Sequence, residues 1–160
     1  MSDQKINIKI GLNAAIISVF QEEPHILVTS SIEGAHSGIP DQLPFGPFNP
    51  LKHRTMEIGL REWVLEQTGL NLAYVEQLYT FADRGRHAET TSTEHEISVG
   101  YLALHNPMRE EANPPRAKNV TRQKIYAYFP WEDWRAGKPS LIDEMIYPEL
   151  RAWIKTSPSP

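Results

Sequence analysis

The chain has 160 residues, with 16 Lys and Arg against 20 Asp and Glu, which gives a net charge of −4. This length suits one domain with a sizeable core, and the acidic balance argues against a strongly basic nucleic-acid surface, while a local basic patch stays open. The absence of cysteine excludes disulfides, thiolate zinc sites and cysteine nucleophiles. No signal peptide is recognisable, and no stretch reaches the roughly 20 apolar residues of a membrane span. We therefore expect a soluble, cytoplasmic protein with no membrane partner.

The first half of the chain predicts a hairpin, a loop and a helix. Residues 7–20, rich in Ile, Val and Ala, are expected as a buried strand, and a turn at 21–24 leads to a second strand over 25–30. Residues 32–48 contain several glycines and prolines and are expected as a loop. A helix is expected near 50–68, with Asn49 as its cap and Pro50 at its first position. Its apolar stripe and C-terminal cap consist of Met56, Leu60, Trp63, Val64 and Gly69.

The second half predicts two strands over 74–81 and 97–104, a shorter strand over 125–129 and a helix over 140–155. Pro148 should start or kink that helix, because proline removes a backbone donor. The order of strands, helix, strands and helix predicts an α+β fold with a mixed or largely antiparallel sheet. We place one domain over 1–155 and a linker-like tail over 156–160, as at the front of a longer protein.

Residues 60–70 (LREWVLEQTGL) resemble the end of a Nudix box, G-x5-E-x7-R-E-U-x-E-E-x-G-U, in which U is aliphatic. Residues 75–86 (VEQLYTFADRGR) and 97–104 (ISVGYLAL) add to the match, which covers roughly residues 10–155. Together they resemble a Nudix subgroup linked to ADP-ribose and NAD metabolism, and most of all the Nudix-like N-terminal domain of bacterial NAD-metabolism transcriptional regulators. In those regulators a winged helix follows. The resemblance implies a Nudix fold, an α/β/α sandwich with a mixed sheet.

The resemblance also implies a metal site on the helix near 50–68, because Nudix enzymes split a phosphoanhydride with Mg²⁺ held by several carboxylates. Aligned without gaps from Gly69, the metal positions of the motif fall on Trp63, Glu66 and Gln67, so that one carboxylate remains. A slip of one residue keeps two, Glu62 and Glu66, on one helix face. Glu62 and Glu66 are thus the catalytic and metal-ligating candidates, or else ordinary solvated residues. In both registers the box is degraded, and we expect weak Mg²⁺ binding.

Five other residues are candidates for ligand binding. Arg84 and Arg86 flank a glycine in a turn, where guanidinium groups can grip phosphate. Tyr79 and Phe81 are two apart in a strand and therefore share one face, which either stacks a nucleobase or belongs to the core. Arg54, close to the expected helix start, suits an anion.

The resulting hypothesis is a non-catalytic Nudix-like domain that senses an ADP-ribose or NAD-related nucleotide as part of a regulator of NAD metabolism. We expect a nucleotide-type ligand, a homodimer as one open assembly, and DNA binding only through a domain absent from this chain. The alternative is a Mg²⁺-dependent Nudix hydrolase of nucleoside diphosphate derivatives such as ADP-ribose. It would use Glu62 and Glu66 with a further carboxylate, Glu94 or Glu96. A third hypothesis is a dimerisation module that has kept only the fold.

Overall fold

The computed structural model of the chain describes residues 7–29, 41–83, 94–107 and 120–156. The chain divides into two compact units, Met1–Gln123 and Lys124–Pro160, and each is described by itself. In the described part, no helix has both the length and the apolar character needed to cross a membrane.

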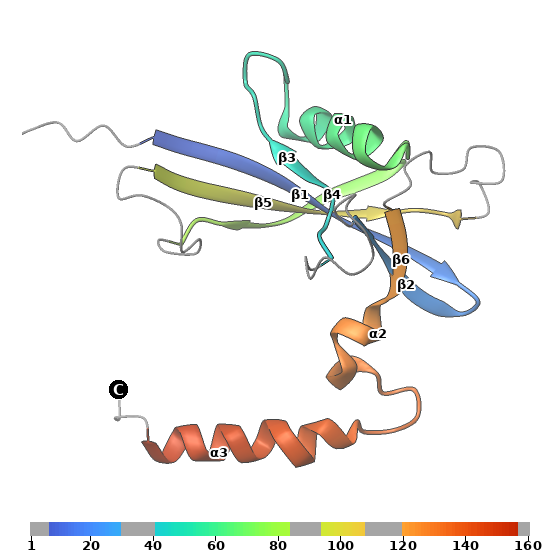
Figure 1. The fold of residues 1–160 in the computed structure, drawn as a ribbon, viewed down its shortest axis with the longest axis vertical. Coiled ribbons are helices and arrows are strands. Elements are labelled where there is room, and N and C mark those ends of the chain that lie inside the picture. Colours follow the sequence, from blue (N-terminus) through green and yellow to red (C-terminus); the bar gives the residue numbers. More distant parts are fainter. Residues whose placement is uncertain (1–6, 30–40, 84–93, 108–119, 157–160) are drawn as a thin grey trace, which may run out of the picture. The chain divides into compact units, whose positions relative to one another are not determined.

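A mixed sheet forms the first unit, and its long strand β1 (Asn7–Phe20) makes most of the pairings. β1 pairs antiparallel with β2 (Glu23–Thr29) and with the short β3 (Phe45–Pro47). It pairs in parallel with β5 (Glu94–Leu104), and the two run side by side in Figure 1. β5 in turn pairs antiparallel with β4 (Tyr74–Phe81), and β6 (Val120–Lys124) lies next to β2. The strand order is β4-β5-β1-β2-β6, with β3 off this path.

Helix α1 (Met56–Thr68) covers one face of this sheet (Figure 1). Alternation along β1 turns Leu12, Ala14 and Ile16 into the core, where they are almost fully buried with Leu60 and Val64 of α1. Each buried aliphatic side chain contributes roughly 1.5–3 kcal/mol of hydrophobic stabilisation. The sheet is therefore held to α1 by one of its two faces.

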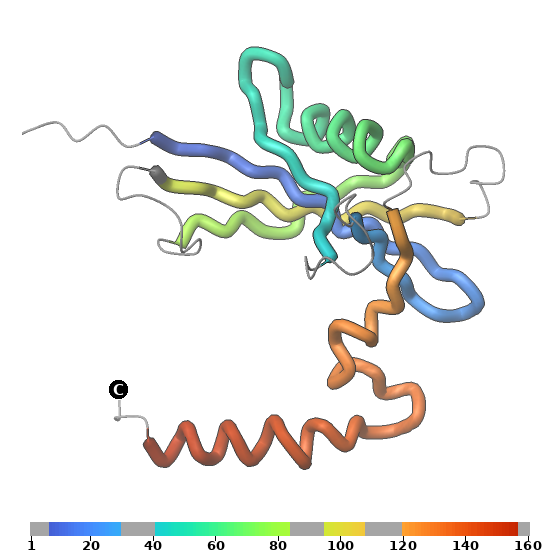
Figure 2. The backbone as a smooth tube through the Cα atoms, in the orientation of Figure 1, coloured from blue at the N-terminus to red at the C-terminus, as the bar shows by residue number. Residues whose placement is uncertain are grey.

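The predicted start of this helix at Pro50 is wrong, and α1 begins at Met56. The backbone N–H groups of Lys52 and His53 donate to the carbonyl of Asn49, at 3.0 and 2.8 Å, and close a separate turn. Thr55 then caps α1, because its hydroxyl accepts the N–H of Ile58 at 3.2 Å. Figure 2 follows the chain from β3 through this turn into the helix. The predicted C-terminal cap is confirmed, since Gly69 has φ = 76°.

The strands over 7–20 and 74–81 and the hairpin of β1 with β2 are confirmed, and β5 starts at Glu94, before the predicted residue 97. The predicted strand over 125–129 is wrong. Ile125–Tyr128 forms a short helix, α2, because the Phe129 N–H donates to the Ile125 carbonyl at 3.1 Å and closes a helical turn. The strand beside β2 is β6, which lies just before it. The predicted loop over 32–48 contains the short strand β3, which was not predicted. Residues 32–40 of that loop lie outside the described residues.

The second unit continues with a short 3-10 turn, η2 (Pro130–Glu132), a π-helical turn, η3 (Ile142–Ile146), and helix α3 (Tyr147–Thr156). Pro148 lacks the N–H that would bond to the carbonyl four residues earlier. The preceding turn is wide, and the Tyr147 N–H bonds to the Ile142 carbonyl. The predicted effect of Pro148 is thereby confirmed.

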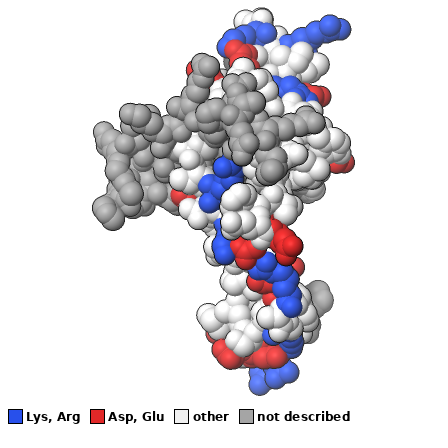
Figure 3. All heavy atoms as spheres, turned by 90° about the vertical axis from the view of Figure 1, so that its right-hand side faces the viewer, with Lys and Arg blue, Asp and Glu red and all other residues white. Residues whose placement is uncertain are grey.

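The α+β class, the mixed sheet, the helix α1 and a C-terminal helix are all confirmed. The second helical layer of the expected sandwich depends on the placement of α3 and stays a prediction. The domain bounds 1–155 and 156–160 also stay a prediction. Figure 3 shows Lys and Arg interspersed with Asp and Glu over the described part of one face, without a continuous basic surface there.

The N-terminal cap of α1 gives a first prediction. Thr55→Ala should lower the free energy of unfolding by about 1 kcal/mol, because the Ile58 N–H loses its side-chain acceptor. Urea denaturation of the purified chain measures this value. Thr55→Ser keeps a hydroxyl and should stay close to wild type. Equal losses in the two variants would show that the hydroxyl does not cap the helix.

Candidate functional site

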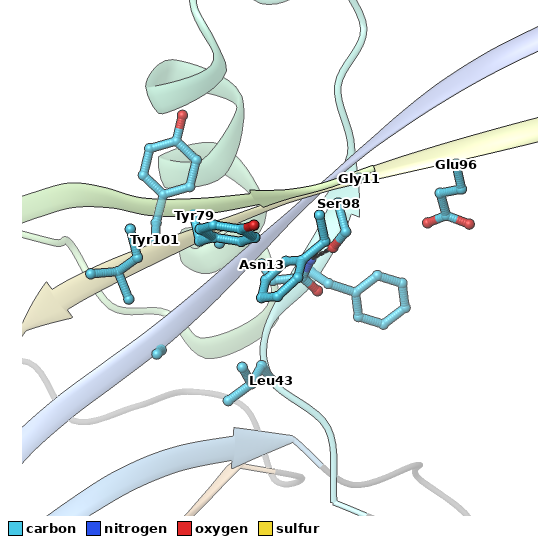
Figure 4. A pocket seen from close by; sticks show the side chains of 12 residues that line it. Gly11, Asn13, Leu43, Tyr79, Glu96, Ser98 and Tyr101 are labelled. Carbon is cyan, nitrogen blue, oxygen red and sulfur yellow. Dashed lines mark hydrogen bonds between the residues drawn. The ribbon is translucent and has the colours of Figure 1, made fainter. Parts of the chain in front are cut away.

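A pocket lies on the sheet face that α1 does not cover, and its volume is about 540 Å³. This volume falls within the range of small-molecule sites. β1 and β5 form its floor, β4 forms one wall, and the segment around β3 forms another (Figure 4). The lining residues are Gly11, Asn13, Ala15, Leu43, Phe45, Leu78, Tyr79, Phe81, Glu96, Ser98, Gly100 and Tyr101.

The pocket follows from the alternation that builds the core. Because Leu12, Ala14 and Ile16 face α1, the residues between them face the other way, and these are Gly11, Asn13 and Ala15. In the parallel register, Gly11 lies opposite Ser98 and Asn13 opposite Gly100. Small side chains at these positions leave the centre of the face hollow.

Tyr79 and Phe81 of β4 supply the aromatic wall. Their ring centroids are 4.8 Å apart at an interplanar angle of 66°. Tyr79 is 62% exposed and Phe81 36% exposed, so the alternative that both belong to the core is wrong. A register shift between Gln77 and Tyr79 changes the strand alternation just before the pair. The two rings present aromatic surface to the pocket, against which a flat aromatic ligand can stack.

Besides its two tyrosines, the pocket is lined by three polar residues, Asn13, Ser98 and Glu96. The Asn13 Nδ2 donates to the Ser98 Oγ at 2.6 Å, which Figure 4 shows as a dashed line. This bond leaves the Asn13 carbonyl oxygen as an acceptor and the Ser98 hydroxyl hydrogen as a donor. A Cβ atom added to Gly11 would lie 3.1 Å from the Glu96 Oε1, so the carboxylate lies close above the floor. The pocket combines apolar walls with donors and acceptors, which suits a polar aromatic group such as a nucleobase.

Glu62 lies on α1, and its carboxylate contacts the side chains of Lys52 and His53. Its Oε1 forms an ion pair with Lys52, and its Oε2 lies 3.1 Å from the buried Nε2 of His53. The Asn49 N–H donates to the His53 Nδ1 at 3.2 Å, so Nε2 is the ring nitrogen on the side of Glu62. The hydrogen bond from Lys52, assisted by the charge of Lys52 and by His53, lowers the pKa of the Glu62 carboxyl.

Mg²⁺ does not fit the side chains of α1. The ion needs several oxygen ligands around one point, and no three His, Asp or Glu side chains among the described residues are grouped to hold a metal. Glu66 is exposed on α1, whereas Trp63 and Gln67 offer no anionic oxygen. Val64 and Leu70 are buried and Gly69 caps the helix, which favours the ungapped register of the Nudix box. In that register Glu66 is the one metal carboxylate that remains.

The structure brings together some of the predicted residues and separates others. Tyr79 and Phe81 share the pocket, whereas Glu62 and Glu66 lie on α1, are not among its lining residues and so form no part of it. Arg54 is exposed and precedes α1, so its placement in the first helical turns is wrong. Arg84 and Arg86 lie outside the described residues.

The pocket floor was missed by sequence reasoning, apart from Glu96, which was considered only as a metal ligand. The available signal was the run of small or polar residues at alternate positions of two strands, Gly11, Asn13 and Ala15 on β1 and Ser98 and Gly100 on β5. Without the strand register, these positions could not be joined into one surface.

The chain has a Nudix fold, as its neighbours among solved structures show. No family model matches the sequence, and no curated protein matches it. The Nudix domain of Shewanella oneidensis NrtR, solved with ADP-ribose, is 15% identical with a TM-score of 0.59, over 92% of this chain and 90% of that one. Full NrtR of that organism is 17% identical with a TM-score of 0.62, over 76% of this chain and 54% of that one. The MutT/nudix family protein of Enterococcus faecalis is 18% identical with a TM-score of 0.57, over 78% of this chain and 46% of that one.

The chain thus spans about half the length of full NrtR and of the Enterococcus faecalis protein. At these identities the likeness establishes the fold and leaves the site to be argued from its own residues.

The contacts of Glu62 with Lys52 and His53 predict that the stability lost on replacing Glu62 depends on pH. Folding lowers the pKa of Glu62 from its ordinary value of 4.5, so its contribution is present above that value and is lost as the pH falls through the folded pKa. Glu62→Gln should therefore lower the thermal midpoint at pH 7, and the difference from wild type should shrink toward pH 3. Glu66→Gln is the charge-matched control and should have little effect at either pH. If Glu62→Gln lowers the thermal midpoint equally at pH 7 and pH 3, the ion pair of Glu62 with Lys52 does not stabilise the fold.

Proposed function

We propose that the chain is a non-catalytic Nudix-fold domain that binds an ADP-ribose or NAD-related nucleotide. The observation that carries this proposal is the contrast between the two faces of the sheet. One face bears a pocket of about 540 Å³ with an exposed aromatic pair and nearby polar groups. The other bears α1, on which Glu62 is held by Lys52 and His53, and the remaining box positions lack carboxylates apart from Glu66.

In this proposal the nucleobase stacks against Tyr79 and Phe81, and its edge meets the donor of Ser98 and the acceptor of Asn13. The carboxylate oxygens of Glu96 are hydrogen-bond acceptors, which suit a hydroxyl-bearing group such as ribose at that end of the pocket. The phosphates are assigned to Arg84 and Arg86, which follow β4 in the sequence, and Arg54 is a further anion contact. The ADP-ribose in the NrtR Nudix domain supports this ligand class.

We assign DNA recognition, within a regulator of NAD metabolism, to a segment outside this chain. The net charge of −4 supports this assignment, because a DNA-binding domain gathers Lys and Arg, and on the face drawn in Figure 3 the described Lys and Arg are interspersed with Asp and Glu. A cytoplasmic location and a homodimer are parts of the same proposal.

Ligand binding is tested by thermal denaturation with millimolar ADP-ribose or NAD. The midpoint should rise, because a ligand that binds only the folded state stabilises it. Tyr79→Ala and Phe81→Ala should each weaken affinity about tenfold, since base stacking is worth about 1–3 kcal/mol. Arg84→Ala and Arg86→Ala should also weaken it, by loss of a charge-assisted contact of about 1.5–3 kcal/mol. Tyr74→Ala, an exposed tyrosine of β4 away from the pocket, is the control. An unchanged midpoint across a nucleotide panel would remove the basis for a nucleotide sensor.

Catalysis separates the proposed sensor from the hydrolase alternative. ADP-ribose hydrolysis with Mg²⁺ should stay near background. Glu66 is the one metal carboxylate of the box that remains, and the carboxylate of Glu62 is already paired with Lys52. Product formation is followed by chromatography over hours. Turnover of about 1 per second or more that disappears in Glu66→Gln would establish the hydrolase instead.

A further inference from the structure

We propose that Trp63 and Gln67 form a metal-independent clamp that fixes β3 and, through it, positions Phe45 as a wall of the ligand pocket. This inference rests on the proposed nucleotide-binding function and adds two positioning residues to it. They stand at the box positions where the ungapped register calls for metal carboxylates.

The amide of Gln67 pairs with the backbone of Phe45 at two points. The Gln67 Nε2 donates to the Phe45 carbonyl at 2.5 Å, and the Phe45 N–H donates to the Gln67 Oε1 at 3.2 Å. The backbone groups of Pro44 and Phe48 point to the opposite edge, toward β1, since the Pro44 carbonyl accepts from the Ala14 N–H and the Phe48 N–H donates to the Ile10 carbonyl. The side-chain amide therefore takes the place of a neighbouring strand along the outer edge of β3.

Trp63 completes this edge. Its Nε1 donates to the Pro47 carbonyl at 3.0 Å, and proline has no N–H to satisfy. Its ring lies against Gly46, where an added Cβ atom would come within 2.2 Å of the ring. Phe45 and Pro47 thus have their outward backbone groups bonded to two side chains of α1, one helical turn apart.

β3 connects this clamp to the pocket because successive residues of a strand face opposite sides. Gly46 is buried against Trp63, whereas Phe45 is 52% exposed and lines the pocket. Phe45 also lies opposite Asn13, a polar residue of the pocket floor. A shift of β3 away from α1 would therefore move the Phe45 ring relative to Asn13.

The clamp and a metal site exclude each other chemically. A glutamate at position 67 has no N–H for the Phe45 carbonyl, and a glutamate at position 63 has none for the Pro47 carbonyl. The residues that are present hold β3 by neutral hydrogen bonds, which need no cation. Nucleotide binding by this chain should accordingly be independent of Mg²⁺.

The test is calorimetric titration of the full chain with ADP-ribose, in 5 mM Mg²⁺ and in EDTA. Wild type should bind equally in both. Gln67→Glu, which removes the donor while keeping the side-chain size, should weaken binding about fivefold, as should Trp63→Phe, since a lost hydrogen bond costs about 1 kcal/mol. Leu65→Ala, at an exposed position of the same helix, is the control and should bind as wild type does.

A double-mutant cycle distinguishes positioning from general destabilisation. Phe45→Ala should weaken binding, and adding Gln67→Glu should weaken it little further, because both variants remove the same wall. Without ligand, amide exchange at Phe45 should speed up in Gln67→Ala, while the Ala14 amide, bonded to the Pro44 carbonyl, stays protected. If Gln67→Glu fails to fold, Trp63→Phe takes its place in the cycle.

The outcomes separate the clamp from the function on which it rests. If wild type binds but the clamp variants bind equally well, or if their effects add to that of Phe45→Ala, the inference is wrong and the nucleotide sensor stands. Binding that requires Mg²⁺ also overturns the clamp. If wild type binds no ADP-ribose, the proposed function fails and the inference fails with it.

Discussion

The parallel pairing of β1 with β5 is the constraint on which the rest of the molecule depends. It aligns two strands whose alternate residues are large and apolar on one side and small or polar on the other. The apolar side needs a cover, and α1 supplies it with Leu60 and Val64. The other side, with Gly11, Asn13, Ser98 and Gly100, forms the floor of the pocket. One register therefore determines both the core and the candidate site.

On α1, the positions that match metal carboxylates of the Nudix box carry side chains that bond to β3. A Nudix-like helix with a full set of carboxylates would concentrate negative charge at one point, which only a cation would offset. Here Glu62 is neutralised by Lys52 beside His53, and the amide of Gln67 and the indole of Trp63 bond to β3. The same helix surface is thus stabilised by contacts within the chain.

The pocket and the helix are connected through a three-residue strand. β3 is too short to be stable alone, and it is held by β1 on one edge and by α1 side chains on the other. The alternate residues of β3 face the helix and the pocket, so a displacement of the strand would move both. The site of a nucleotide sensor built in this way would include residues that never touch the ligand.

The sequence by itself determined the fold class, the long strands and the C-terminal cap of α1, because apolar periodicity and a glycine are local signals. It also determined that the box was degraded, since Trp63 and Gln67 cannot ligate a cation whatever their surroundings. Tertiary structure decided where α1 begins, because residues 49–53 close a separate turn on the Asn49 carbonyl and Thr55 caps the helix. It also decided that Tyr79 and Phe81 line a pocket and that β3 exists at all. Strand register and side-chain clamps join residues far apart in sequence, and no local pattern records which distant partner a strand face will meet.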